Sequence, residues 1–133
     1  MKKFLTIMLG IVFMTVPVRA QDKNFNSRNA LKAKEMVQKA VAFYQANGLD
    51  KTIAAVNDTK GQFVDGELYV FIHSFEGINL ARGDGNLKRL GTNVLNSKDP
   101  DGKLFVQEMI KIAKQKGQGE TSYGFKNEKT GKI

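Results

Sequence analysis

The residues most suited to chemistry lie in an aromatic hairpin that leads to a single arginine, Arg82. Residues 67–73 have the alternation of a strand, Glu76-Gly77 has the composition of a tight turn, and residues 78–82 form the returning strand. A two-residue turn at this place predicts three cross-strand pairs: Phe75 with Ile78, His73 with Leu80, and Phe71 with Arg82.

This register puts four residues on one face of the hairpin: Tyr69, Phe71, His73 and Arg82. A guanidinium holds a carboxylate through two parallel hydrogen bonds, and an apolar surrounding strengthens that contact. We therefore expect a small pocket for a carboxylate, with Tyr123 from a later strand in its lining and the tyrosine hydroxyls as donors. The alternatives are a solvated arginine at a strand end and aromatic side chains that serve only as core.

The opposite face of the first strand is purely aliphatic, with Leu68, Val70 and Ile72 at alternate positions. An aliphatic strand face of this kind suits packing against a helix. The hairpin is therefore predicted to separate a binding face from a core face.

His73 is the only histidine of the chain. A zinc site would need further ligands, but the chain has no cysteine and no carboxylate spaced to help this histidine. Two interpretations remain, a neutral pocket histidine that forms hydrogen bonds and a buried structural histidine. We expect neither a metal nor a cofactor.

Five residues fall at positions one, three, five, six and twelve of a calcium-loop template: Ser97, Asp99, Asp101, Gly102 and Glu108. The first ligand is a serine instead of an aspartate, Pro100 interrupts the loop, and no long helix enters it. We expect a turn that leads into a helix.

No pattern typical of catalysis stands out. Residues 83–85 contain two glycines but lack the lysine and the strand-loop-helix context of a phosphate loop. One histidine and scattered acidic residues give no spacing for a catalytic triad, and no pair of carboxylates is distinctive. We expect a binding protein and not an enzyme.

A long amphipathic helix is predicted over residues 27–47, with Ser27 as its N-cap and Gly48 at its end. Asp50 is expected to cap a short second helix over residues 51–56. Apolar residues form a stripe along one side of the long helix, and this stripe is interpreted as core. The alternative is that one end of the helix mediates dimer contact. Its apolar positions recur with helical spacing: Ala33, Met36, Val37, Ala40, Val41 and Tyr44.

The remaining elements complete an α+β pattern. Residues 21–26 are polar and are expected to be disordered. The order helix, helix, hairpin, helix, strand indicates an antiparallel sheet. After the hairpin we expect one helical turn at residues 87–90, a helix over 104–116, a strand over 121–125 and a turn over 127–131.

Residues 1–20 have the composition of a secretory signal peptide. Lys2 and Lys3 precede an apolar run, and Val18-Arg19-Ala20 offers the small-x-small pattern for cleavage before Gln21. Cleavage would give a periplasmic or secreted protein. The alternative is an uncleaved membrane anchor, although the apolar run is shorter than the roughly 20 residues that a bilayer span needs.

The formal net charge of the chain is +8, and it falls to +5 if Lys2, Lys3 and Arg19 are removed. The lysines are dispersed and do not alternate with aromatic residues, so nucleic-acid binding is not expected. A mildly positive field instead favours anionic small molecules as ligands.

From Tyr69 to Lys132, several short motifs follow one another: the aromatic strand, the Gly turn, the returning strand, a Gly-Thr-Asn segment, the helix start DPDGKLF and a strand that contains Tyr123. This order of motifs resembles that of the bacterial single Cache domain, type 2-like. The resemblance covers nearly all of residues 21–133. The resemblance implies a PAS-like extracytoplasmic sensor fold, in which a long N-terminal helix packs on a curved antiparallel sheet. It also implies binding of a small molecule, often a short organic acid.

The chain departs from that pattern after the motif N-x-x-T-G-K at residues 127–132, where family members continue into two further strands. We therefore expect a sheet that lacks its last strands, a pocket without its opposite wall, and an unpaired edge at residues 121–125.

The sequence thus predicts an exported, sensor-type domain for a short organic acid, without a signalling output of its own. A membrane receptor or a second copy of the chain is expected as its partner. The alternative is a non-binding structural or interaction module, or a truncated remnant, that pairs through its open sheet edge.

Overall fold

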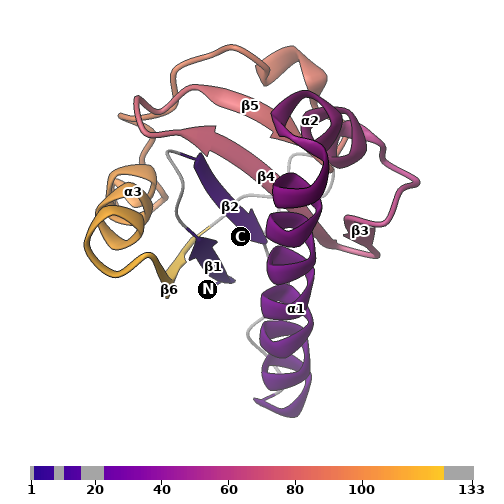
Figure 1. The fold of residues 1–133 in the computed structure, drawn as a ribbon. Helices are drawn as coiled ribbons and strands as arrows, with labels where there is room; N and C mark the ends of the chain where they lie inside the picture. The colour runs from indigo at the N-terminus through magenta and orange to yellow at the C-terminus, as the bar shows by residue number, and fades with distance from the viewer. Residues whose placement is uncertain (1, 8–10, 16–22, 125–133) are drawn as a thin grey trace.

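The computed structural model describes residues 2–7, 11–15 and 23–124, and it has the predicted α+β architecture (Figure 1). Helices α1 (Lys23–Asn47) and α2 (Leu49–Asn57) lie on one side of an antiparallel sheet. Helix α3 (Phe105–Lys116) lies apart from them, beside the first and the last strand of the described residues. Within the described ranges, no helix combines the length and the apolar character needed to cross a membrane.

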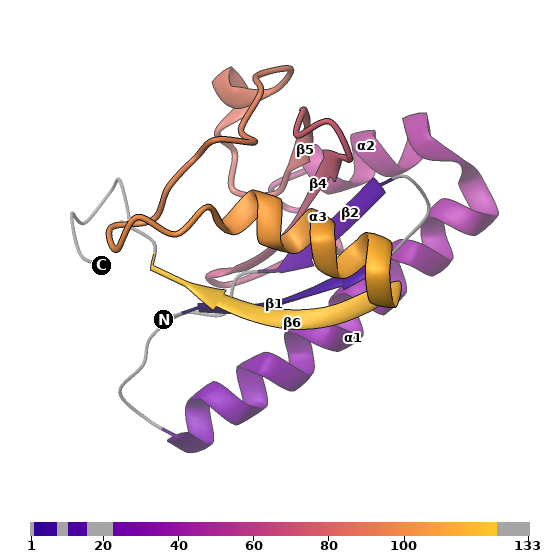
Figure 2. The same cartoon turned by 90° about the vertical axis from the view of Figure 1, so that its left-hand side faces the viewer.

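Strand β4 (Leu68–Ser74) is the centre of the sheet. It pairs antiparallel with β5 (Asn79–Arg82), with β2 (Ile11–Thr15) and with the short β3 (Val64–Asp65). A second ladder joins β1 (Lys2–Ile7) to β6 (Gln118–Tyr123). Figure 2 shows β1 and β2 side by side between β6 and β4.

One edge of β6 pairs with β1, which was not expected, and no described strand pairs with its other edge, so one open edge remains there as predicted. Lys2 pairs with Tyr123 and Ile7 with Gln118, while β2 pairs along β4 from Ile11 with Ser74 to Thr15 with Val70. The partner strand β1, like β2, lies within the first fifteen residues, which the sequence predicted to be removed as part of a signal peptide. Their cleavage stays a prediction, and their place in the sheet could not be expected from the leader-like composition.

Helix α1 begins at Lys23, four residues before the predicted start, so Ser27 lies inside the helix and is not its cap. Residues 23–26 are helical and not disordered as expected, and residues 21–22 lie outside the described part of the chain. The apolar stripe is confirmed: Ala33, Val37 and Ala40 are buried, and Met36, Val41 and Tyr44 are partly buried. The first turns of the helix carry no such stripe, so no helical periodicity marks them in the sequence.

Gly48 ends α1 as predicted. Its N–H donates to the carbonyl oxygen of Tyr44 at 2.8 Å, and its φ of +83° is the left-handed conformation that glycine adopts freely. Gly48 also precedes the first residue of α2, so Asp50 lies in the first turn of that helix and does not cap it. The two helices therefore meet at one glycine.

The later elements lie close to their predicted ranges. A 3₁₀ turn covers Leu87–Arg89, and α3 begins one residue after the predicted start. Strand β6 begins three residues before the predicted strand and ends at Tyr123. Phe125 and the turn predicted over residues 127–131 lie outside the described residues.

Two apolar clusters lie on opposite faces of β4, as the alternation of its side chains requires. The cluster on the α1 and α2 side contains Val70 and Ile72, and Leu68 is buried as well, which confirms the predicted core face. Its buried members are Val37, Ala40, Val56, Phe63, Val70, Ile72 and Ala81. The cluster on the α3 side consists of Phe71, Val94, Val106, Met109, Ile110, Ala113 and Tyr123.

The hairpin loop is one residue longer than predicted. The N–H of Gly77 donates to the carbonyl oxygen of Ser74 at 3.0 Å, and the N–H of Ser74 donates to that of Ile78 at 2.9 Å. Phe75, Glu76 and Gly77 therefore form a three-residue loop, and the predicted pair of Phe75 with Ile78 is wrong. Gly77 has a φ of +84°, as the last residue of such loops requires, and a Cβ there would lie 2.7 Å from the Cβ of Leu95.

A β-bulge beside this loop restores the predicted register. His73 pairs with Asn79 instead of Leu80, and the ladder then shifts so that Phe71 pairs with Arg82, as predicted. Leu80, the residue left over by the shift, packs against the apolar cluster under α1. The three-residue loop thus places a polar residue, Asn79, opposite His73, and the bulge realigns Phe71 with Arg82.

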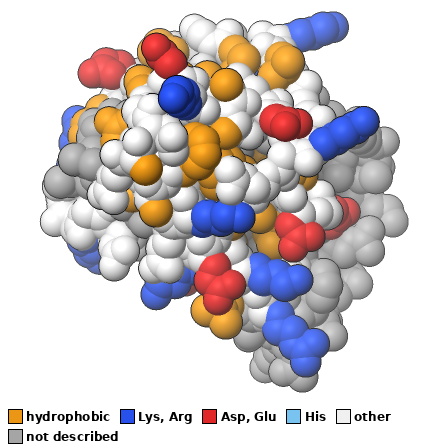
Figure 3. Space-filling view, turned by 45° about the vertical axis from the view of Figure 1, so that its right-hand side comes forward, with side chains coloured by type: hydrophobic (Ala, Val, Ile, Leu, Met, Phe, Trp, Pro, Cys, Tyr) orange, Lys and Arg blue, Asp and Glu red, His pale blue; other side chains and the backbone are white. Residues whose placement is uncertain are grey.

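The surface over α1 and α2 carries charges of both signs. Figure 3 shows Lys and Arg side chains interspersed with Asp and Glu on this face. Lys32 of α1 and Asp65 of β3 form an exposed ion pair of 3.8 Å. In this view the described side chains of the face form no patch of a single charge sign.

Candidate ligand-binding site

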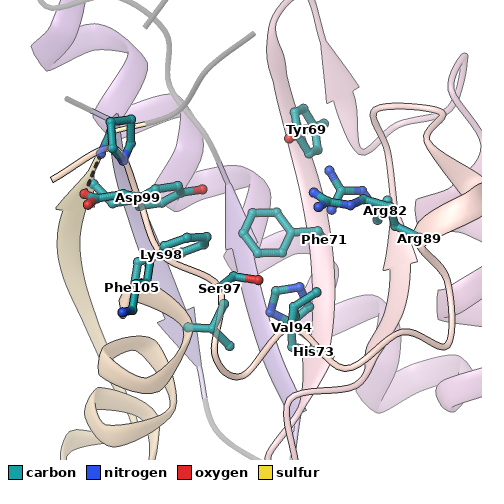
Figure 4. Close-up of a pocket in the computed structure, with 14 residues that line it drawn as sticks. Tyr69, Phe71, His73, Arg82, Arg89, Val94, Ser97, Lys98, Asp99 and Phe105 are labelled. Atoms are coloured by element: carbon teal, nitrogen blue, oxygen red, sulfur yellow. Dashed lines mark hydrogen bonds between the residues drawn. The ribbon is translucent and has the colours of Figure 1, made fainter. Parts of the chain in front are cut away.

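A cavity of about 490 Å³ opens on the α3 side of β4 and β5, and all five residues predicted for the pocket line it. Tyr69, Phe71 and His73 come from β4, Arg82 from the end of β5, and Tyr123 from the end of β6. Figure 4 shows the first four along one wall. The alternation of β4 and the confirmed pair of Phe71 with Arg82 explain why they converge.

The opposite wall comes from the chain between β5 and α3 and from the start of α3. The expectation that this wall would be missing is therefore wrong (Figure 4). Sequence reasoning missed the residues of this wall because an irregular loop has no periodicity that would reveal which side chains turn inward. The residues of this segment that matter for the chemistry are Ser97, Lys98, Asp99 and Phe105 on the opposite wall, and Arg89 and Val94, which lie on the side of Arg82 and His73 (Figure 4).

Aromatic rings supply most of the apolar lining. The ring centroids of Phe71 and His73 lie 4.9 Å apart, and those of Tyr69 and Phe71 lie 6.1 Å apart. Across the cavity, Phe105 and Tyr123 stack with centroids 4.3 Å apart and an interplanar angle of 3°. Rings held by one another in this way present a fixed apolar surface to a ligand.

Arg82 is buried, with 7% of its surface exposed, and it is held from two sides. Its backbone N–H donates to Oδ1 of Asn57 at 2.8 Å, and its Nε donates to Oδ1 of Asp84 at 3.0 Å. Nη2 donates to the other carboxylate oxygen of Asp84. The contact uses the Nε and Nη2 edge of the fork, so the Nη1 edge lies outside the pair with Asp84.

The electrostatics of this pair keep both groups charged. Burial lowers the pKa of Arg82, but the Asp84 carboxylate and the nearby tyrosines outweigh burial and raise it overall. Burial raises the pKa of Asp84, but the hydrogen bonds from Arg82 outweigh it and hold that pKa below its usual value. Tyr69, whose hydroxyl also bonds to Asp84, has a pKa raised by burial and by that carboxylate, so its hydroxyl stays protonated as a donor.

Two further cations, Arg89 and Lys98, line the cavity and are exposed to solvent. The carboxylate of Asp99 also lines the cavity, but backbone N–H groups occupy both of its oxygens. Asp101 and Lys103 donate to Oδ1 at 2.9 and 2.8 Å, and Gly124 donates to Oδ2 at 3.1 Å (dashed line in Figure 4). These bonds lower the pKa of Asp99 and give it a structural role.

The calcium-loop template is a turn, as predicted. The oxygens of Asp99 hold the turn that leads into α3, and Glu108 pairs with Lys103 and accepts a hydrogen bond of 2.6 Å from Thr121. Within the described residues, no group of three or more acidic or histidine side chains is placed to hold a metal ion.

His73 is the most unusual polar residue of the cavity. Only 3% of its surface is exposed, and neither ring nitrogen has a hydrogen-bond partner in the part of the chain that the structure describes. Burial, together with the positive charge of Arg82, lowers the pKa of His73 to about 3. The imidazole is therefore neutral at physiological pH, with one donor and one acceptor nitrogen.

The fold and the cavity define a class: an α+β domain with a half-polar, aromatic pocket of the size that holds a small molecule. Residues 19–133 match the Cache domain family, and the chain belongs to that family. Cache domains are extracytoplasmic sensing and binding domains and not enzymes. No match was found among the curated proteins or among the solved structures.

The family match begins at residue 19, so strands β1 and β2 lie outside it. The part of the chain that matches supplies β4 and β6, and the segment before it supplies the two strands between them. The matched residues therefore contain the whole described lining of the cavity but not the whole sheet.

Proposed function

We propose that this domain is an exported sensor-type module whose pocket binds a short organic acid. The observation that carries the proposal is the cavity itself, in which a buried guanidinium lies beside aromatic rings at the end of β5. A volume of about 490 Å³ is in the range of small-molecule sites, which are mostly apolar with a few convergent polar groups.

Recognition would depend on the Nη1 edge of Arg82. The pair with Asp84 fixes the guanidinium in place, which removes the entropy cost of ordering a flexible side chain when a ligand binds. Tyr69, Phe71 and Tyr123 exclude water around it, so the contact with a carboxylate gains strength from the low dielectric. The exposed cations Arg89 and Lys98 would attract an anion toward the opening.

A thermal-shift screen of short carboxylic acids followed by calorimetry tests the proposal. A ligand at 100 times its Kd stabilises a protein by about 3 kcal/mol, which raises the Tm of a domain of this size by about ten degrees or more. Arg82→Ala should weaken binding by about 10- to 100-fold, because a hydrogen bond to a charged group contributes roughly 1.5–3 kcal/mol.

Two variants control for loss of folding and of charge. Arg82→Lys keeps the charge but loses the fork, so binding should weaken without loss of the fold. Arg28→Ala removes the same charge from the exposed surface of α1 and should leave affinity unchanged. If no acid of the screen stabilises the protein, or if Arg82→Ala folds and binds with unchanged affinity, the organic-acid proposal is wrong.

The signal peptide and the partner complete this proposal. Cleavage before Gln21 would release the domain into the periplasm or the medium, where it would carry its ligand to a membrane receptor. Mass spectrometry of the exported protein would measure the first residue directly, and a chain that begins at Met1 in the cell envelope would instead support the anchored form.

A second candidate function is pairing with another chain through the sheet. It is favoured by one observation: β4 pairs with β2 and β6 pairs with β1, and both β1 and β2 precede the family match and belong to the predicted signal peptide. After cleavage, these two strand edges would be free to accept strands from a second chain. Light scattering of the processed protein separates the two candidates, since a dimer indifferent to every acid supports pairing and a monomer stabilised by one acid supports binding.

A further inference from the structure

Two buried polar side chains lie together at the cavity: His73, which lines it, and Asn79, which lies behind His73. Both are buried, with 3% and 0% of their surface exposed, and they pair directly across β4 and β5. Cross-strand partners have their Cβ atoms roughly 5 Å apart on the same face of a sheet, so the two side chains are neighbours on the cavity face.

Four polar atoms of this pair have no hydrogen-bond partner within the described residues: Nδ1 and Nε2 of His73, and Nδ2 and Oδ1 of Asn79. Buried polar groups almost always have partners, so such a cluster needs an explanation. The neighbouring backbone groups do have hydrogen-bond partners. The N–H of Asn79 donates to the carbonyl oxygen of residue 92, its carbonyl oxygen accepts from residue 91, and the N–H of Arg82 donates to Asn57. Among the described residues, the missing partners are therefore confined to these two side chains.

The three-residue loop is the reason that this pair exists. A two-residue loop would put Leu80 opposite His73, and the cavity face would then have an apolar neighbour there. The longer loop instead brings Asn79 opposite His73. The β-bulge that follows leaves Leu80 packed against the α1 cluster and restores the pair of Phe71 with Arg82 on the cavity face.

The chemistry of the pair selects an uncharged partner. A neutral imidazole offers one donor and one acceptor, and an amide offers both as well. A ligand ammonium would lie near the positive charge of Arg82, and a second carboxylate would find no cation at His73 itself. A hydroxyl or a carboxamide, which donates and accepts without charge, matches the pair.

We propose that His73, with Asn79 behind it as a positioning residue, forms a polar subsite for a hydroxyl or carboxamide group of the ligand. This inference rests on the proposed binding of an organic acid, and it narrows the ligand to an acid with a second, uncharged polar end. His73 lines the cavity and contacts the ligand, whereas Asn79 lies outside the lining and holds the other ring nitrogen once the ligand is bound.

The backbone spacing of the two strand positions sets the length of the acids to be tested. Arg82 pairs with Phe71, which lies two residues from His73 along β4, and each strand residue advances about 3.3 Å. The carboxylate and the polar end should therefore lie about 7 Å apart. An acid with a main chain of four or five carbon atoms fits this spacing.

The experiment compares matched acids by calorimetry on the folded protein: pentanoate, which lacks a polar end, against 4-hydroxybutanoate and succinamate. We expect at least one polar-ended acid to bind about tenfold more tightly than pentanoate. In His73→Phe this ratio should fall to near one while the affinity for pentanoate stays within about threefold. His73→Gln, which keeps a donor and an acceptor, should retain part of the ratio.

Two further variants separate positioning from folding. Asn79→Leu should lower the ratio by about threefold, and Asn47→Leu, at an exposed asparagine near the end of α1, should leave it unchanged. A ratio near one in the unaltered protein, or a ratio unchanged in His73→Phe, would overturn the subsite while leaving the organic-acid proposal intact. Binding of no acid in either series would overturn both.

Discussion

The two faces of β4 differ in the surroundings of their buried side chains. On the α1 side, Val70 and Ile72 lie fully buried among other apolar side chains. On the α3 side, the alternate residues Phe71 and His73 face a cavity, and a buried arginine and a buried histidine interrupt the packing. One strand of seven residues thus carries the stabilising core on one face and the site on the other.

From this difference we expect the α1 face of β4 to stabilise the fold and the cavity face to lower stability in return for ligand binding. An apolar face gains free energy from every buried methylene group. A cavity lined by unpartnered polar atoms costs free energy until a ligand fills it, which is typical of functional sites. The comparison is therefore best tested by substitutions at neighbouring residues of the same strand.

The largest effect is expected from Ile72→Ala on the α1 face. Ile72 is completely buried, so the variant should lose about 2–5 kcal/mol of the free energy of unfolding, through lost burial and a cavity that closes only in part. Urea titration measures this loss. Ligand affinity of the folded fraction should stay the same, and a parallel loss of affinity would mean that the two faces are coupled.

A smaller loss is expected from breaking the pair of Arg82 with Asp84 on the cavity face. Arg82→Met leaves a partly buried carboxylate without its cation, and we expect a loss of about 2 kcal/mol, because 20% of the Asp84 side chain remains exposed and solvent screens its charge. The double variant Arg82→Met with Asp84→Leu should recover most of this stability in denaturant titrations. If the double variant is no more stable than the single one, the pair itself is not what the single substitution disrupts.

The neutral His73 makes stability depend on pH. Its pKa is about 3 in the folded protein and near 6.5 in the unfolded chain, so the unfolded chain binds more protons between these values. The free energy of unfolding should therefore fall as the pH drops below about 6.5, by about 1 kcal/mol per pH unit from this residue, with no effect above pH 7.

This slope is measured as the difference between the unaltered protein and His73→Phe, because carboxylates titrate in the same range in both. Equal slopes in the two proteins would show that His73 is protonated in the folded state or exposed to water there.

The smallest effect is expected from His73→Phe at pH 7, and its sign is the informative part. The substitution removes two unpartnered buried nitrogens and keeps a ring of similar size beside Phe71. The Tm of the ligand-free protein should rise by a few degrees, equivalent to about 1 kcal/mol. A fall in Tm would mean that the imidazole is already satisfied, for example by a buried water molecule.

Much of the site was predictable because strand alternation is a local rule. The face of β4 that carries Tyr69, Phe71 and His73, and its pairing with Arg82, follow from the sequence alone. The predicted pair of Phe71 with Arg82 is present although the loop has three residues instead of the predicted two. The longer loop and the bulge shift the register by one residue in opposite directions, so their effects cancel at this pair. The choice between a two-residue and a three-residue loop depends on contacts such as that of Gly77 with Leu95, which the local sequence does not reveal.

The sequence by itself determined the α+β class, the apolar stripe of α1, the two faces of β4 and the five residues that meet in the cavity. Those features depend on periodicity, which each element carries within its own residues. Only the tertiary structure decided that Asp84 pairs with Arg82, that the loop before α3 forms the opposite wall, and that β1 and β2 lie between β4 and β6. These depend on contacts between segments far apart in the chain, where no local pattern specifies the partner.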